Sequence, residues 1–266
     1  MRATKLYSTG DIRTVNVDIP SPAKNEILIK VEAAGICGTD RHLYHGEFPS
    51  VPDKILGHEF SGIVVDSGET DFAEGARVTC DPNTWCGTCN QCQRGRVNLC
   101  PNNLATGIHR DSGFAEFCVF PASKAVVLPN EINPLYGAFC EPLACTLHGM
   151  DIGAAREGET VLVIGGGVIG LMAVQLAKLA GAEVLLLTRS PEKQALGLNI
   201  GADYAVSTGD AVRNIWPEGA DLVVECAGVS ATVTLSPRLA RSGGRVVILG
   251  VVSQGEMVPI EPFDLL

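Results

Sequence analysis

The chain has 266 residues with a formal net charge of −10, and 46% of its residues are hydrophobic but only 5% aromatic. This length suffices for two folded domains, and thirty glycines with few aromatics favour an α/β protein over a helical bundle. The acidic balance, without a long basic run, argues against nucleic acid or an anionic membrane as a partner. No signal peptide or membrane span is recognisable, so a cytoplasmic location is expected.

The N-terminal half is predicted to be rich in short strands. Alternating or β-branched runs, bounded by glycine or proline, are typical of strands. They occupy residues 26–32, 62–66, 76–80, 115–120 and 125–128. Strands at this spacing indicate an irregular all-β or α+β unit.

Two segments of this half carry potential metal ligands, Cys37 in residues 35–42 and His58 with Glu59 in residues 57–62. Taken singly, Cys37 is better explained as a buried thiol and His58 as a core histidine. Together with one or two carboxylates, they would leave zinc an open position for a substrate oxygen.

The next segment holds four cysteines in the spacing C-x2-C-x2-C-x7-C, which suits one tetrahedral zinc ion. These ligands are Cys86, Cys89, Cys92 and Cys100. The surrounding residues 82–101 are too polar to be ordered by burial, so metal–sulfur bonds could supply the order. Disulfides, an iron–sulfur cluster and unpaired thiols are the alternatives. The cysteines outside the metal-ligand segments are expected to be buried free thiols; they are Cys80, Cys118, Cys140, Cys145 and Cys226.

Residues 108–111 follow this lobe and carry charge, so they could line a substrate pocket or form a solvated loop. Further on, Glu141 precedes an apolar helix predicted over residues 143–153. Since this helix enters the second half of the chain, Glu141 would stand at a hinge, where a substrate cleft between domains commonly forms.

From residue 140 on, strand and helix alternate in the manner of βαβ units, which predicts a parallel doubly wound sheet. Strands are predicted at residues 160–164, 183–187, 204–206, 221–225 and 245–249, and helices at 171–180 and 191–199. The predicted domains are therefore residues 1–145 and 146–266.

The first of these strands runs into a G-x-G-x-x-G motif formed by Gly165, Gly167 and Gly170, with Val168 and Ile169 at the start of the following helix. The strand–loop–helix context indicates a dinucleotide site. The first glycine would make the tight turn, the second would admit the pyrophosphate at the helix N-terminus, and the third would allow close packing. A glycine-rich turn without a ligand is the alternative.

The second strand of the sheet ends at Thr188 and Arg189, without the Asp or Glu that would bind the ribose 2′-hydroxyl of NAD. Lys193 follows one turn later, so two cations could meet a 2′-phosphate. This favours NADP over NAD, although both cations could equally be solvated residues of a site with relaxed specificity.

The chain resembles the zinc-dependent medium-chain dehydrogenases of the alcohol dehydrogenase superfamily. The resemblance lies in four features that follow one another along the chain: Cys37-Gly38-Thr39-Asp40, the segment 57–62, the four cysteines and the glycine motif. The resemblance is closest to the sorbitol, threonine and 2-deoxy-scyllo-inosamine dehydrogenase branch, because Glu141-Pro142-Leu143 stands where classical alcohol dehydrogenases carry a cysteine ligand. It implies a GroES-like catalytic domain over residues 1–145, with a structural zinc lobe at 82–101, and a Rossmann domain over 146–266.

The resemblance also implies residue roles. Cys37 and His58 would ligate a catalytic zinc, with Glu59 and Glu141 as carboxylates at or beside the metal. Asp40 would accept a hydrogen bond from the imidazole of His58.

In the same comparison, Thr39 matches the hydroxyl that takes the substrate proton, and His42 matches the residue that passes it toward solvent. The implied activity is hydride transfer from a secondary alcohol, in a polyol, cyclitol or sugar-like molecule, to NADP or NAD. Two zinc ions per chain, one catalytic and one structural, and a homo-oligomer of the full-length protein complete the expectation.

Members of this family continue for several dozen residues beyond the fifth Rossmann strand, whereas this sequence ends soon after it with an apolar tail, Leu265 and Leu266. A fragment with an uncovered sheet edge is therefore expected. A chain that binds zinc and nucleotide but turns over weakly is the alternative function. A zinc-free quinone reductase relative is disfavoured by Cys37, His58 and the four cysteines.

Overall fold

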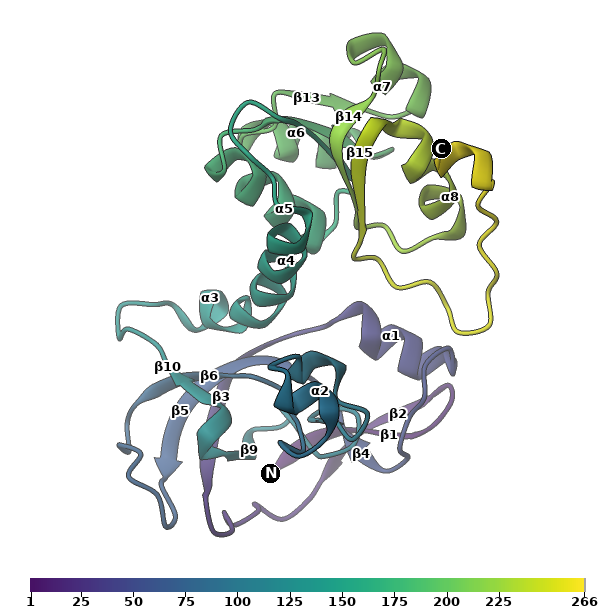
Figure 1. The fold of residues 1–266 in the computed structure, drawn as a ribbon. Helices are drawn as coiled ribbons and strands as arrows, with labels where there is room; N and C mark the ends of the chain where they lie inside the picture. Colours follow the sequence, from purple (N-terminus) through teal and green to yellow (C-terminus); the bar gives the residue numbers. More distant parts are fainter. Residues whose placement is uncertain (266) are drawn as a thin grey trace. The chain divides into compact units, whose positions relative to one another are not determined.

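The structure, a computed structural model, describes residues 1–265, and the chain divides into two compact units, Met1–Glu141 and Pro142–Leu266 (Figure 1). The predicted boundary after residue 145 falls inside helix α4 (Cys140–Gly153). Of the predicted apolar tail, Leu265 ends the short 3-10 helix η3 (Pro262–Leu265), and Leu266 lies outside the described residues.

The first unit is built on a five-stranded antiparallel sheet, whose hydrophobic face forms the core of the unit. Its strands, in sheet order, are β10 (Ala125–Val127), β6 (Arg77–Cys80), β5 (Glu59–Asp66), β3 (Glu26–Gly35) and β9 (Phe117–Pro121). The rings of Phe60 and Phe120 pack edge to face at its centre, 5.6 Å apart. All five predicted strand segments of this half are therefore confirmed.

Two smaller sheets complete the strands of this unit. A three-stranded sheet has the order β2 (Asp11–Asn16), β1 (Arg2–Ser8), β4 (Lys54–Ile55), and a two-stranded one pairs β7 (Asn83–Thr84) with β8 (Leu104–Ala105). None of these was predicted. In β1, only Ala3 and Leu6 of seven residues are buried, so the strand carries almost no hydrophobic pattern.

The helices of the first unit are short, and one of them begins at a predicted metal ligand. They are α1 (Gly38–His45), α2 (Asn90–Gln93) and α3 (Pro134–Ala138), with 3-10 turns η1 (Val97–Leu99) and η2 (Ala122–Lys124). Cys37 is the N-cap of α1, and its backbone N–H donates to the carboxylate of Asp40, 2.9 Å away. Asp40 thereby fixes the entry into the helix at Cys37.

The second unit is a parallel five-stranded sheet with the order β13 (Tyr204–Val206), β12 (Glu183–Leu187), β11 (Thr160–Ile164), β14 (Ala220–Glu225), β15 (Ala240–Ile248). Relative to the chain this is the order 3-2-1-4-5 of a doubly wound sheet, so the predicted α/β fold class is confirmed. The strand order reverses between β11 and β14. In such sheets ligands bind at this point, beside the carboxyl ends of the strands.

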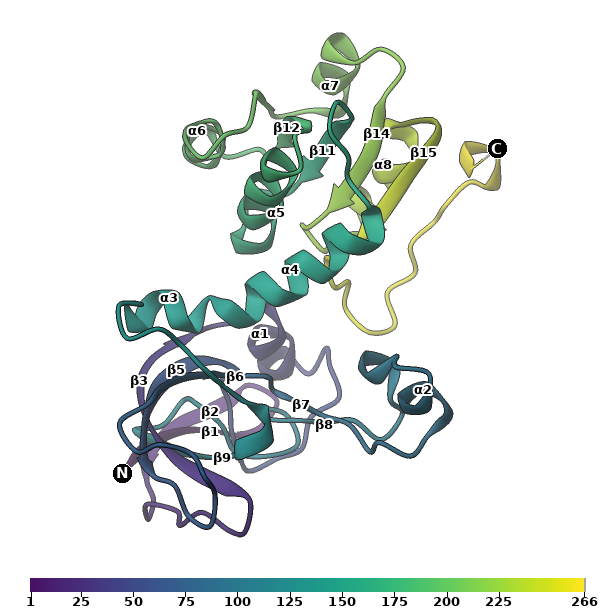
Figure 2. The ribbon, with the colours of Figure 1, turned by 60° about the vertical axis from the view of Figure 1, so that its left-hand side comes forward.

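Both faces of this sheet are covered by helices (Figure 2). Val161 and Val163 belong to a core that includes residues of α4 and α5 (Val168–Leu179), whereas Leu162 and Ile164 belong to a core with α7 (Gly209–Ile215) and α8 (Ser230–Leu239). Helix α6 (Pro191–Asn199) lies against β12. Because β11 is buried on both faces, its sequence is continuously apolar, as predicted.

After β15, the chain returns to helix α8. Arg238 pairs with Asp264 at 2.7 Å, and the Thr234 hydroxyl donates to the carbonyl of Pro259 at 3.0 Å. Among residues 1–265, β15 has a strand neighbour on one side only. Within the same range, no helix has both the length and the apolar character needed to cross a membrane.

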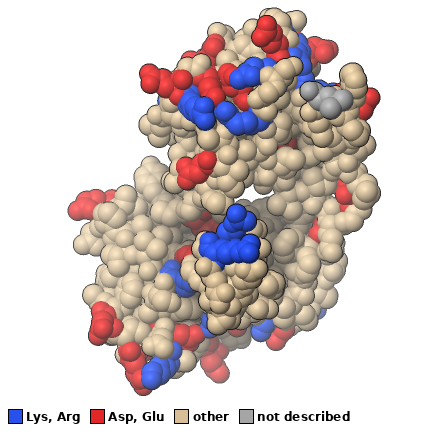
Figure 3. Space-filling model, in the orientation of Figure 1, with Lys and Arg blue, Asp and Glu red and all other residues tan. Residues whose placement is uncertain are grey.

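Acidic and basic side chains are interspersed over the displayed face of the molecule (Figure 3). Among the cysteines, Cys80 and Cys118 are buried as expected, but Cys145 is exposed, and Cys140 and Cys226 are half-buried. The expectation failed for Cys145 because the buried side of α4 is formed by residues such as Thr146 and Gly149. Apolar neighbours in sequence therefore did not place Cys145 on the buried face.

The packing of α6 on β12 generates a stability test. A Cβ on Gly197 would lie 2.3 Å from Cδ2 of the fully buried Leu186. Alanine is the better helix former, but overpacking should lower the free energy of unfolding of Gly197→Ala by about 1–3 kcal/mol.

Gly209→Ala in α7 is the matched control, because its Cβ would meet Leu235 at an ordinary 3.5 Å. We expect this variant to be as stable as the parent or up to about 1 kcal/mol more stable. Denaturant unfolding measures both, and a Gly197→Ala variant no less stable than Gly209→Ala would contradict the packing.

Candidate functional site

Three potential metal ligands of the first unit converge: Cys37 before α1, and His58 and Glu59 at the start of β5. One ligand atom from each lies within 4.8 Å of the others, and we call this group the Cys37 cluster. Strand pairing sets Glu59 opposite Gly35, where a Cβ would lie 2.3 Å from Oε2 of Glu59. Any larger residue at position 35 would therefore displace this carboxylate.

Burial shapes the protonation of the Cys37 cluster. It raises the pKa of the Cys37 thiol to about 11, and it also raises the pKa values of Glu59 and Asp40. A bound cation would reverse this effect, since it favours the thiolate and the carboxylates. The donor set of sulfur, imidazole and carboxylate suits zinc.

Asp40 and His58 provide a second indication that the site fits a metal. Both are buried, and Oδ1 of Asp40 and Nδ1 of His58 have no hydrogen-bond partner among the described residues. The two atoms face each other at 3.9 Å, which is too long for the predicted hydrogen bond. Unpaired buried polar atoms are costly, and the imidazole of a metal-bound histidine commonly has a carboxylate partner of this kind.

Glu141, the fourth predicted ligand, lies outside the Cys37 cluster. It is near enough for its charge to contribute to the raised pKa of Glu59, after the larger effect of burial. Its role at the metal remains a prediction.

The two predicted proton-transfer residues lie on α1. Thr39 Oγ1 is 3.7 Å from Sγ of Cys37, and Nδ1 of His42 is 2.8 Å from Oε2 of Glu47. The sequence prediction missed Glu47. The sequence feature that could have indicated Glu47 is Gly46, the C-cap of α1. Gly46 has a left-handed conformation (φ 72°) and turns the chain so that Glu47 N–H donates to the His42 carbonyl.

The four-cysteine lobe, residues 82–101, gathers the sulfur atoms of its four cysteines within 4.8 Å of one another. The sulfurs of Cys86 and Cys100 are 3.6 Å apart, and those of Cys89 and Cys100 are 3.9 Å apart. Metal–sulfur bonds of about 2.3 Å in a tetrahedron give about 3.8 Å between sulfurs, whereas a disulfide requires about 2.05 Å. The lobe therefore has the geometry for one tetrahedral ion and not for disulfides.

Backbone donors surround these sulfurs. The N–H of Cys89 donates to Sγ of Cys86 at 3.4 Å, and the N–H of Cys92 donates to Sγ of Cys89 at 3.5 Å. Hydrogen bonds from Thr88 and Cys89 lower the pKa of the Cys86 thiol. Such bonds favour thiolates, the form that binds metal.

A buried cation ties the lobe to the rest of the unit. Nζ of Lys124 lies 2.8 Å from the ring centroid of Trp85 in the lobe and 2.9 Å from Oδ2 of Asp81. Lys124 is only 9% exposed. A cation over an indole face is attracted by the ring, more strongly when it is desolvated.

In the second unit, the dinucleotide loop, Gly165–Gly170, has three different glycine environments. Gly165 has φ +107°, and a Cβ there would meet backbone N of Ala227 at 2.9 Å. A Cβ on Gly170 would lie 1.8 Å from the carbonyl oxygen of Gly165, whereas one on Gly167 would meet nothing within 4 Å. The loop is thus tightly packed on the protein side and open at Gly167, the N-cap of α5, where a pyrophosphate would approach. Val168 and Ile169 follow in the first turn of α5.

The end of β12 adjoins this loop. A Cβ on Gly166 would lie 3.0 Å from Oγ1 of Thr188 and 2.9 Å from Cβ of Lys193. Arg189 and Lys193 are both exposed, and within residues 1–265 neither has an acidic partner in salt-bridge range. Two cations without acidic partners could therefore meet a phosphate beside the dinucleotide loop.

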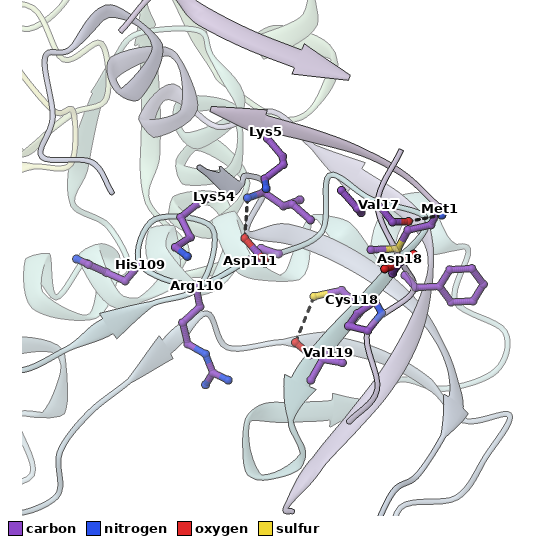
Figure 4. Close-up of a pocket in the computed structure, with 14 residues that line it drawn as sticks. Met1, Lys5, Val17, Asp18, Lys54, His109, Arg110, Asp111, Cys118 and Val119 are labelled. Carbon is purple, nitrogen blue, oxygen red and sulfur yellow. Dashed lines mark hydrogen bonds between the residues drawn. The ribbon is translucent and has the colours of Figure 1, made fainter. Parts of the chain in front are cut away.

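The loop at residues 108–111 borders a cavity of the first unit. His109, Arg110 and Asp111 line a cavity of about 430 Å³ in the first unit, together with Lys54 (Figure 4). Asp111 accepts the backbone N–H of Ile55 at 2.9 Å, so the loop is held in place. No residue of the Cys37 cluster lines this cavity. His109 and Asp111 are exposed at the rim of this cavity, and a role of the loop in lining a substrate pocket stays a prediction.

Two protein-family descriptions match the chain: an alcohol dehydrogenase GroES-like domain at residues 23–130 and a zinc-binding dehydrogenase domain at residues 168–266. The chain is 34% identical to a sorbitol dehydrogenase of Halalkalibacterium halodurans, over 94% of this chain and 76% of the relative. It is 33% identical to D-arabinitol dehydrogenase 1 of Uromyces fabae, over 97% and 78%.

Among solved structures, a zinc-binding dehydrogenase of Sinorhizobium meliloti 1021, bound to NADP, superposes with a TM-score of 0.95 at 55% identity. The match covers 99% of this chain and 80% of that one. These similarities extend across both units.

The geometry of the four-cysteine lobe generates a test by metal removal. The chain has two tryptophans, and Trp216→Phe would leave Trp85 as the single indole. In that variant, we expect chelation to shift the emission to longer wavelength and to increase quenching by acrylamide, because the lobe opens and Trp85 leaves Lys124.

Adding Cys92→Ser should produce the shifted spectrum before chelation. Adding Cys37→Ser should leave the response to chelation intact. An emission spectrum that is unchanged by complete metal removal would show that the lobe is ordered without metal.

Proposed function

This chain belongs to the zinc-binding alcohol dehydrogenase family and is an oxidoreductase linked to NAD or NADP, and from that premise we propose that it oxidises a secondary alcohol in a polyol, cyclitol or sugar-like substrate. The observation that carries the proposal is the Cys37 cluster. Its three convergent ligand groups would leave a position for a substrate oxygen, unlike the closed set of four sulfurs in the lobe.

The polyol class has two supports. Relatives that match nearly the whole chain are sorbitol and D-arabinitol dehydrogenases by name. In addition, Glu59 belongs to the Cys37 cluster and Glu141 is close enough to affect its pKa. Two carboxylates make the site more polar than a thiolate-rich one, which suits a substrate with adjacent hydroxyl groups.

We propose Cys37 and His58 as ligands of a catalytic zinc, with Glu59 and Glu141 as the carboxylates that bind it or lie beside it. When bound, zinc supplies a positive charge that polarises an alcohol oxygen and lowers its pKa. Cys37 must release its proton for metal binding, because burial keeps the thiol protonated otherwise. Asp40, which already holds Cys37 N–H, is placed to orient the imidazole of His58.

The substrate proton would leave along α1. Thr39, whose hydroxyl adjoins Sγ of Cys37, would take it, and His42 would pass it toward solvent. The two residues are three positions apart on the helix and so lie on the same face. Glu47 would fix the tautomer and orientation of His42 through its bond to Nδ1.

The hydride acceptor is a nicotinamide dinucleotide, for which we propose NADP as the preferred form. Gly165, Gly167 and Gly170 would hold the pyrophosphate at the start of α5, beside Val168 and Ile169. Thr188, Arg189 and Lys193 would surround the 2′-phosphate. The NADP bound to the Sinorhizobium meliloti structure supports this choice.

The proposal further includes a second, structural zinc held by the four-cysteine lobe, and thus two zinc ions per chain. It also includes a cytoplasmic location and a homo-oligomeric full-length protein. Within residues 1–265, no disulfide joins any cysteines, which is compatible with a reducing compartment.

A substrate panel with metal analysis tests the activity. We expect sorbitol, arabinitol or inositol to be oxidised faster than ethanol and long-chain alcohols, and two zinc ions per chain. His58→Ala should lose turnover and the catalytic zinc but retain the structural zinc, whereas Cys92→Ser should lose the structural zinc. Fastest turnover on ethanol would overturn the substrate class, and normal turnover by His58→Ala would overturn the site. Two zinc ions with bound nucleotide but no turnover would favour the alternative of a binding-competent, inactive chain.

The cofactor preference has its own test. Arg189→Ala should raise the Kd for NADPH about tenfold, because a charge-assisted contact to the 2′-phosphate is lost, and leave the Kd for NADH unchanged. Arg156→Ala, an exposed arginine before β11, is the control and should change neither. Equal changes in both dissociation constants for Arg189→Ala would exclude a 2′-phosphate contact.

A further inference from the structure

Glu225 is a buried carboxyl group that the proposed chemistry does not use. It ends β14, its side chain is 0% exposed, and it has no cationic partner in salt-bridge range among the described residues. A buried carboxylate normally requires a charge or several hydrogen-bond donors. The contacts of Glu225 therefore identify the segment whose conformation it stabilises.

The donors come from the loop after β14. Oε1 of Glu225 accepts the N–H of Ala227 at 2.8 Å, the N–H of Gly228 at 3.1 Å and the hydroxyl of Thr232 at 2.7 Å. Gly228 has φ +65°, and its N–H also donates to Oε2 at 3.3 Å. The side chain thus fixes the conformation of residues 226–229 from inside.

A close contact with Gly250 also restricts the position of the carboxyl group of Glu225. A Cβ on Gly250, after β15, would lie 2.4 Å from Oε2 of Glu225 and 2.2 Å from the backbone N of Gly228. Gly250 N–H in turn donates to the carbonyl of Glu225 at 3.0 Å. The loop after β14 is therefore clamped between its own strand and the turn after β15.

The outer side of this loop faces the dinucleotide loop. A Cβ on Gly165 would meet backbone atoms of Ala227 and Cys226 at 2.9 and 3.0 Å. Ala227 and Val229 are themselves exposed. Since β11 and β14 are neighbours at the point where the strand order reverses, their two loops flank the crevice in which doubly wound sheets bind ligands.

We propose that Glu225 is a positioning residue for the dinucleotide, because it holds residues 226–229 as the side of the crevice opposite the dinucleotide loop. This proposal rests on the proposed function. Without the carboxyl group, the N–H groups of Ala227 and Gly228 lose their acceptor, the loop relaxes, and the crevice no longer matches the cofactor.

The test compares two carboxylates of the same strand. Glu225→Gln places an amide donor where Gly228 N–H now donates, so we expect the Kd for NADPH to rise about tenfold. Asp221→Asn, at the amino end of β14, is the matched control. Asp221 also accepts three donors, from Thr160 and Arg241, but it lies far along the sheet from the crevice. The Kd of Asp221→Asn for NADPH should stay within about twofold of the parent value. Both variants should lose a comparable amount of thermal stability.

Direct titration of nucleotide fluorescence gives these constants without turnover. Thr232→Val, a milder variant that removes one donor, should raise the Kd in the same direction if Glu225→Gln fails to fold. The KM for the dinucleotide should rise more than kcat falls, and zinc content should be unchanged.

An unchanged Kd in Glu225→Gln, or an equal rise in Asp221→Asn, would overturn the positioning role. A parent protein that binds neither NADPH nor NADH would instead overturn the proposed function, so the two failures are distinguishable.

Discussion

Buried negative charge requires a compensating partner, and this constraint governs both units. In the first unit, Cys37, Glu59 and Asp40 are gathered where burial raises the pKa of each. Leaving such groups ionised without a cation would cost several kcal/mol. In the second unit, Glu225 is fully buried and is supplied with N–H and hydroxyl donors by its own chain. The proposed metal would complete the first arrangement, whereas the second is complete with the donors of its own chain.

The two cysteine-containing sites differ in how many ligand groups the protein supplies. In the four-cysteine lobe, four sulfur atoms lie within 4.8 Å of one another and accept backbone N–H groups, so a tetrahedral metal held by all four would have no place for another ligand. The Cys37 cluster offers fewer protein donors, and an orienting carboxylate stands behind its histidine. The proposed chemistry thus belongs to the site with fewer protein donors, and the proposed structural role to the site with four sulfurs.

Much of this fold could be predicted from the sequence, because β11 and β12 are apolar runs buried on both faces and because glycines mark the dinucleotide loop. Strands β1 and β2 could not, since RATKLYS and DIRTVN carry little hydrophobic pattern. Helix α8 was missed because its sequence is rich in Ser, Thr and Val and includes Pro237. At the site, residue types predicted that Cys37, His58 and Glu59 meet, whereas Glu141, predicted with them, lies outside the cluster. They could not give the 3.9 Å between Asp40 and His58, or the turn that brings Glu47 to His42, because those depend on tertiary packing.

The four-cysteine lobe has a consequence for the degradation of the protein in a cell. Its helical segments α2 and η1 contain no buried residue, so it is ordered by the sulfur cluster, the Lys124 contact and the pairing of β7 with β8 at its edge. For a segment ordered by a bound ion, the local free energy of unfolding grows with the logarithm of the free ion concentration. Protease resistance of this segment would then follow zinc supply, and chains made during zinc scarcity would be the first to be degraded.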